Sequence, residues 1–193
     1  MKKIWLPALA TLLAIAAGPA LAQDLTADSF SDGPNGAKVH VASGFVCPAT
    51  IGHFERDAAG QSDVETGADF CSYAALDGVY GTIRLTPLSG PYDPKASLTQ
   101  DFIEQEGTGG KRISENVVKV AGKGTAEPLA VFTRTYETAK LEDLHYHVLF
   151  TGSAVQNWAV EAIIEYASPR EDKQAQDFLN AVYSGAQAQL AAK

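Results

Sequence analysis

Two histidines separated by one residue are the best candidates for chemistry in this sequence. His145 and His147 lie in the run 144-LHYHVLFT-151, which is rich in the β-branched and aromatic residues typical of a strand. Because alternate residues of a strand project from the same face, the two imidazoles would lie side by side, a geometry that metal sites use. We therefore predict His145 and His147 as metal ligands.

A metal site of this kind needs at least one further ligand from another strand. The sequence offers Glu161, or the neighbouring residues Thr133, Arg134 and Thr135, as sources of a third group. The alternative is structural, with Tyr146, Val148 and Phe150 filling the core while both histidines occupy a partly hydrated face. Strand pairing cannot be read from the sequence, so both interpretations stay open.

The chain contains two cysteines, Cys47 and Cys71, 24 positions apart. In an exported domain such a pair predicts a disulfide, which on the chain-entropy model stabilises the fold by about 3 to 4 kcal/mol. A redox pair would favour the C-x-x-C spacing, which is absent here. A structural zinc site would need four ligands, with His40 or His53 completing an unusual set.

The segment between the cysteines carries a charged cluster, 53-HFERD-57. Loops held by a rigid scaffold often carry function, so His53 and Arg56 are candidate binding residues. The alternative is a helical turn whose charges pair with one another. No nucleophile elbow of the G-x-S-x-G type is present, and Ser43-Gly44 and Ser89-Gly90 resemble turns. We predict no catalytic residue and no cofactor.

The elements that must position these residues are mostly strands. Two β-like runs, 70–76 and 79–88, are separated by Asp77-Gly78, a hairpin signal. A short helix is expected after Ser97 and up to Gly107. The last helix is expected to begin with Ser168 as its N-cap and Glu171 completing a capping box. Between these helices four further strands are expected, at 115–121, 128–137, 144–151 and 157–167.

The expected fold class is α+β, with an antiparallel sheet of about five to seven strands and at least two packed helices, one of them C-terminal. The run 157-NWAVEAIIEYA-167 alternates, so that Trp158, Val160, Ala162, Ile164 and Tyr166 face one way and Glu161 and Glu165 the other. The final helix carries its apolar residues at i, i+3 and i+4, which fits packing onto a sheet.

The order of elements over about residues 80 to 190, with the strand 157-NWAVEAIIEYA-167 followed by a helix bearing 178-FLNAVYSG-185, resembles the Mog1/PsbP-like α/β/α sandwich. The resemblance implies non-enzymatic accessory or binding roles. It does not extend to the cysteine segment, and a shared fold does not transfer a function.

The N-terminus has the pattern of a cleaved signal peptide. Lys2 and Lys3 precede an apolar stretch, and Ala20-Leu21-Ala22 gives the small-x-small cleavage pattern. We predict a signal peptide over 1–22, a flexible arm over 23–36 and a single globular domain over 37–193. The expected location is the periplasm, or outside the cell if the source is not a Gram-negative bacterium.

Removing Lys2 and Lys3 from the 15 basic residues leaves 13 against 23 acidic ones, a net charge of −10. Such an acidic domain is a poor match for nucleic acid or anionic lipid, whose phosphates require clustered lysine and arginine. No membrane insertion is expected after cleavage. The sequence favours an exported binding or accessory protein without catalytic activity, for an unidentified protein or small-molecule ligand. The alternative is a metal-dependent enzyme or metal-binding protein that uses His145 and His147.

Overall fold

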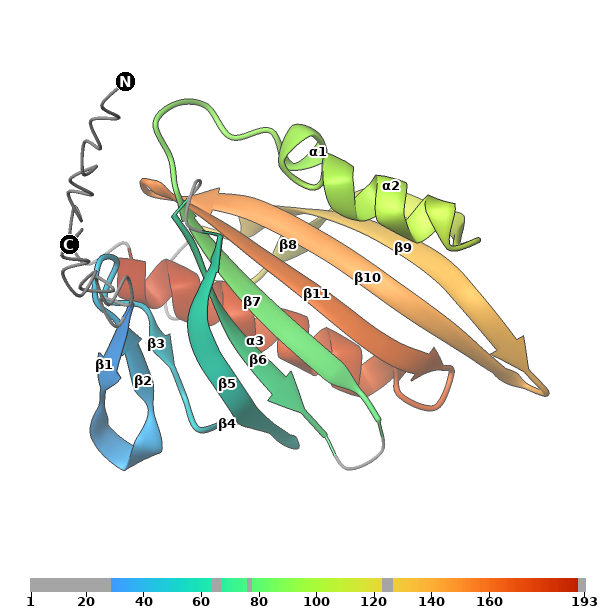
Figure 1. The fold of residues 1–193 in the computed structure, drawn as a ribbon, viewed down its shortest axis with the longest axis horizontal. Helices are drawn as coiled ribbons and strands as arrows, with labels where there is room; N and C mark the ends of the chain where they lie inside the picture. The colour runs from blue at the N-terminus through green and yellow to red at the C-terminus, as the bar shows by residue number, and fades with distance from the viewer. Residues whose placement is uncertain (1–28, 64–66, 76–77, 123–126, 191–193) are drawn as a thin grey trace, which may run out of the picture.

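An eight-stranded antiparallel sheet forms the body of the structure, shown in Figure 1. The computed structural model describes residues 29–63, 67–75, 78–122 and 127–190. The strand order across the sheet is β4-β5-β6-β7-β11-β10-β9-β8. The strands are β4 Thr50–Ile51, β5 Phe54–Asp63, β6 Ala68–Ala74, β7 Tyr80–Pro87, β8 Lys111–Val120, β9 Leu129–Leu141, β10 Leu144–Val155 and β11 Trp158–Ser168. Strands β8 to β11 therefore form a meander that runs from the edge of the sheet inward, and β11 pairs with β7 at the centre of the sheet.

A second, three-stranded sheet lies beside the first and contains β1 (Phe30–Asp32), β2 (Lys38–His40) and β3 (Val46–Cys47). A 3-10 turn, η1 (Pro34–Gly36), connects β1 to β2. The last part of the predicted arm, residues 30–36, contains β1 and η1. Phe30 is buried and packs against His40 with ring centroids 5.2 Å apart, which fixes β1 to the core. The predicted signal peptide lies outside the described residues.

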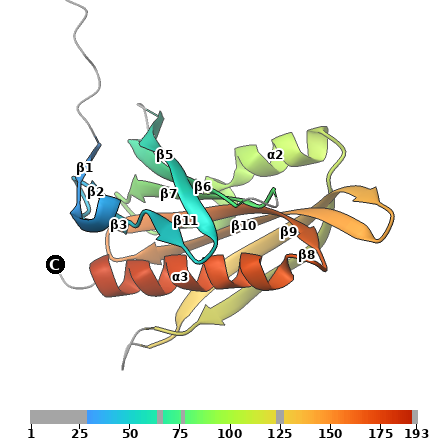
Figure 2. The ribbon, with the colours of Figure 1, turned by 90° about the horizontal axis from the view of Figure 1, so that it is seen from below.

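Helices cover both faces of the large sheet (Figures 1 and 2). On one face lies α3 (Asp172–Leu190), whose buried residues include Phe178, Leu179 and Tyr183. They pack with the sheet residues Ile83, Val160 and Ile164 in the larger of two hydrophobic clusters. In Figure 2 this helix runs along the sheet on the side opposite to α2.

The other face carries α1 (Pro94–Ser97) and α2 (Thr99–Gly107). Asp93 is the N-cap of α1, and its side chain accepts a hydrogen bond from the Lys95 backbone N–H. From this pair of helices, Leu98 and Phe102 pack on a smaller cluster that contains Phe132, Tyr136, Val148 and Phe150. The helix expected between Ser97 and Gly107 is thus present, divided at Leu98. Within the described part of the chain, no helix is both long and apolar enough to span a membrane.

The fold confirms the α+β class with a C-terminal helix, but the expected strand number was too low. The segment 53-HFERD-57 forms the end of the turn before β5 and the first residues of that strand, and it is not a helical turn. The strand has a bulge after Arg56, which interrupts the alternation of side chains from which strands are predicted. The last helix begins at Asp172, later than expected, because β11 continues to Ser168 and pairs there with His145.

The alternation predicted for β11 is present and sets the chemistry of the two faces. Val160, Ala162 and Ile164 face α3 in the larger cluster. On the other face, Ile163 packs against the smaller cluster under α2. The same two-residue period, carried across paired strands, decides which polar side chains can meet on each face.

Candidate metal centre

His145 and His147 lie side by side at the start of β10, and Glu137 of β9 joins them. One ligand atom from each of the three side chains lies within 4.8 Å of the other two. The imidazole centroids are 6.2 Å apart, and His145 Nδ1 is hydrogen-bonded to Glu137 Oε2. All three residues are partly exposed, so an ion from solvent can reach their donor atoms.

Strand pairing places Glu137 in this cluster. His147 lies directly opposite Glu137 in the β9–β10 ladder, whereas His145 lies opposite Lys140. The register shifts between Tyr146 and His147, so one additional residue, Thr138, is accommodated in β9 as a bulge. Directly opposed residues share a face of the sheet, so Glu137 points to the same side as His147, and His145 two residues earlier does too.

The cluster lies on the α3 face, close to where that helix begins. Tyr166 of β11 is opposite His147 on its other side, and its ring meets the imidazole edge-on with centroids 5.4 Å apart. Asp172, the first residue of α3, acts electrostatically on both His147 and Tyr166. The site is therefore bounded by three strands and by the start of a helix.

The environment favours the protonation states that metal ligands need. Burial lowers the pKa of His147 below its usual value, against the opposing influence of Glu137 and Asp172. The hydrogen bond from His145 lowers the pKa of Glu137. A metal ion binds neutral imidazole and ionised carboxylate, so both shifts favour the binding forms at neutral pH.

This donor set fits a divalent transition metal. Two imidazole nitrogens and one carboxylate oxygen suit zinc, nickel, copper or iron(II), while calcium and magnesium prefer oxygen ligands alone. Donor atoms about 2 Å from a tetrahedral zinc ion lie about 3.3 Å from one another, so side-chain rotations would have to bring the three groups closer together than they are here. A bound ion would replace the hydrogen bond between His145 and Glu137.

The expected sources of the third group were wrong. Arg134 is on the opposite face, with its guanidinium 3.7 Å from the centre of the Phe102 ring. Thr135 and Thr133 lie opposite Leu149 and Thr151, progressively farther along β10 from the histidines. The sequence does place Glu137 near the end of the strand that precedes the histidine strand in a hairpin. The bulge in β9 could not be foreseen, so the residue opposite His147 could not be identified by counting along the two strands.

Glu161 also belongs to the opposite face. Its Oε1 accepts hydrogen bonds from Tyr92 Oη at 2.9 Å and Ser97 Oγ at 2.6 Å, and Arg84 Nη2 lies 3.2 Å from its Oε2. The residue is buried. It anchors the segment before α2 to the sheet, and it cannot contribute to the histidine site.

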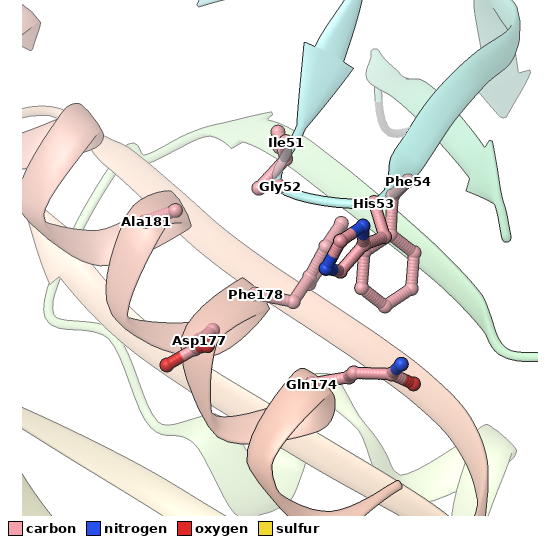
Figure 3. Close-up of a pocket in the computed structure, with 8 residues that line it drawn as sticks. All are labelled: Ile51, Gly52, His53, Phe54, Gln174, Asp177, Phe178 and Ala181. Atoms are coloured by element: carbon pink, nitrogen blue, oxygen red, sulfur yellow. The ribbon is translucent and has the colours of Figure 1, made fainter.

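The two candidate binding residues of the charged cluster have different surroundings. His53 lines a small cavity of about 80 Å³ between the β4–β5 turn and α3, together with Phe54, Asp177 and Phe178 (Figure 3). Arg56 does not line it. Its guanidinium donates to the backbone carbonyls of Cys47 and Gly36, each at 2.7 Å, and so connects β5 to the three-stranded sheet.

The predicted disulfide between Cys47 and Cys71 is present. It joins β3 of the small sheet to β6 of the large one, and both residues are buried. Cys47 and Cys71 therefore belong to the scaffold of the N-terminal region and lie in a different part of the fold from the histidine cluster.

Sequence reasoning missed a buried chain of three polar side chains. Ser43 Oγ lies 2.6 Å from His40 Nδ1, and His40 Nε2 lies 2.7 Å from Asp69 Oδ2. The residue types match a nucleophile–base–acid chain, yet all three are buried. Ser43 Oγ also accepts the Phe45 backbone N–H at 3.0 Å. A substrate cannot reach the serine, so this cluster is structural.

No family model matches this chain, and no curated protein matches it either.

Proposed function

We propose that this protein is an exported, non-catalytic binding protein whose ligand is a divalent transition-metal ion held by Glu137, His145 and His147. The observation that carries the proposal is the convergence of the three donor groups within 4.8 Å at a solvent-accessible end of the sheet. A carrier or accessory role also agrees with the resemblance to the Mog1/PsbP-like sandwich, which the helix–sheet–helix layering supports.

Zinc binding by the purified, metal-stripped protein tests the proposal. We expect one zinc ion per chain with a Kd at or below about 10 μM, which corresponds to about 7 kcal/mol. Replacing the two histidine ligands in the variant His145→Ala/His147→Ala should abolish this binding in a calorimetric titration. Circular dichroism of the variant would show that the sheet is intact.

A matched control is His53→Ala, which removes a histidine from a different surface. It should bind zinc as tightly as the unaltered protein, because His53 lines the cavity beside α3 and not the metal centre. Equal zinc affinity in the double variant and the unaltered protein would exclude the site. So would the absence of saturable binding of zinc, nickel or copper.

Three protein ligands and an open coordination position also characterise catalytic zinc sites, so a metal-dependent enzyme is the second candidate. The partial exposure of all three ligands favours it, because a water molecule could occupy the open position. Hydrolysis of an activated ester such as 4-nitrophenyl acetate by the zinc-loaded protein, lost in His145→Ala/His147→Ala, would identify the enzyme. Zinc binding without turnover would identify the carrier.

A further inference from the structure

A groove of about 330 Å³ lies on the opposite face of the sheet, between α2 and strands β10 and β11. Its volume falls in the range of small-molecule sites. It is separate from the metal centre, because Glu137, His145 and His147 point toward the α3 face. The groove therefore requires an explanation of its own.

The floor of the groove is apolar. It is formed by Val148 and Phe150 of β10 and Ile163 of β11. Val148 and Phe150 belong to the hydrophobic cluster under α2, and Ile163 packs against that cluster. These side chains are already held by their neighbours, so the floor is a preformed surface on which an apolar group would lose water contact.

The rim of the groove is acidic. Asp101 and Glu104 lie one turn apart on α2, and Glu165 lies across from them on β11. Arg84 binds Asp101 through Nη1 at 3.2 Å and Nη2 at 2.6 Å, but the same guanidinium lies 3.2 Å from the buried Glu161. One arginine shared in this way leaves the rim negative. The groove lining itself contains no lysine or arginine.

We propose that this groove binds a small organic cation, consisting of an ammonium group attached to one apolar group. Charge complementarity selects the ammonium group, and the apolar floor selects the attached hydrocarbon. A bare metal ion fits less well, because the three carboxylates do not converge. The one convergent set of potential metal ligands among the described residues is Glu137, His145 and His147.

Phenethylammonium is a suitable probe, and 2-phenylethanol is its neutral counterpart of nearly the same shape. We expect phenethylammonium to saturate the protein with a Kd of about 1 mM or tighter. The alcohol should bind at least about five-fold more weakly because it lacks the charge. Added salt should weaken the binding of the cation and leave that of the alcohol unchanged. Chemical-shift titration of the isotope-labelled protein would measure both affinities.

The variant Glu104→Gln/Glu165→Gln keeps the shape of the rim and removes two charges. It should weaken phenethylammonium about five- to ten-fold. The control Glu55→Gln removes an exposed acid of β5, outside the groove, and should bind as the unaltered protein does. The variant His145→Ala/His147→Ala should also bind the cation normally, which separates this inference from the metal proposal.

Three results would overturn the inference. These are the absence of saturation up to about 20 mM probe, equal affinity for the alcohol, and equal weakening by Glu55→Gln. Each would show that the groove does not select for an organic cation.

Discussion

Two histidine–carboxylate contacts in this protein use the same functional groups in contrasting surroundings. In the pair of His40 and Asp69 the side chains are 1% and 10% exposed, whereas in the pair of His145 and Glu137 they are 35% and 27% exposed. His40 is enclosed by the rings of Phe30 and Trp158, at centroid distances of 5.2 and 5.1 Å. Access from solvent distinguishes the two pairs, so donor chemistry alone does not make a metal site.

We call the buried His40–Asp69 contact the closed pair and the partly exposed His145–Glu137 contact the open pair. The two side chains of the closed pair depend on each other more strongly than those of the open pair do. Asp69 Oδ1 is buried and has no hydrogen-bond partner among the described residues, so Asp69 relies on His40 through its other oxygen. A buried carboxylate that loses its partner is costly, whereas an exposed one is solvated by water. We therefore expect substitutions to affect stability at the closed pair and metal binding at the open pair.

Substitution at the closed pair should give the largest effect. His40→Ala should lower the free energy of unfolding by about 3 to 5 kcal/mol, because it leaves Asp69 buried without its partner and removes a packed ring. Urea denaturation would measure the change. His53→Ala, in an accessible turn, should change stability by less than about 0.5 kcal/mol. Similar losses in both variants would contradict the distinction between closed and open sites.

Removal of the disulfide should give a somewhat smaller effect. The bond is near the closed pair in sequence, since Cys71 follows Asp69 by two positions in β6. The variant Cys47→Ser/Cys71→Ser should lose about 3 to 4 kcal/mol of stability, yet its folded fraction should bind zinc with unchanged affinity. A loss of zinc affinity would show that the disulfide region and the histidine cluster are coupled, and would contradict the distinction drawn between the closed and the open pair.

The smallest expected effect is a pH dependence at the open pair. Burial lowers the pKa of His147, so the folded, metal-free protein favours neutral His147 more than the unfolded chain does. The resulting stabilisation is present above the unfolded pKa of about 6.5 and is lost as pH falls through the folded value. Urea denaturation between about pH 8 and about pH 5, a range that spans this pKa, would detect the loss of stability.

The matching variant for this measurement is His147→Gln, which does not titrate. The difference in stability between unaltered protein and variant should shrink as the solution is acidified. A difference that grew on acidification would mean that Glu137 and Asp172, which favour charged His147, outweigh burial.

Local pattern was enough to predict much of this protein. The period of two in β11, the hairpin signal between β6 and β7 and the 3.6-residue period of α3 predicted the elements and the faces they bury, because these signals arise within short segments. The cysteine pair was predictable because only one pairing was available. β5 was missed because a bulge breaks its alternation, and β1 because three residues are too few to show one.

By itself, the sequence determined that His145 and His147 share a face, since strand geometry fixes residues two apart. Only the tertiary structure decided that Glu137 joins them, because that depends on the register of β9 against β10 and on a bulge that shifts it. The tertiary structure likewise decided that His40 is enclosed, because the residues around it come from three separate strands, namely Phe30, Trp158 and Asp69. Accessibility is a property of the assembled chain, and it separates the buried histidine from the two that a metal ion can reach.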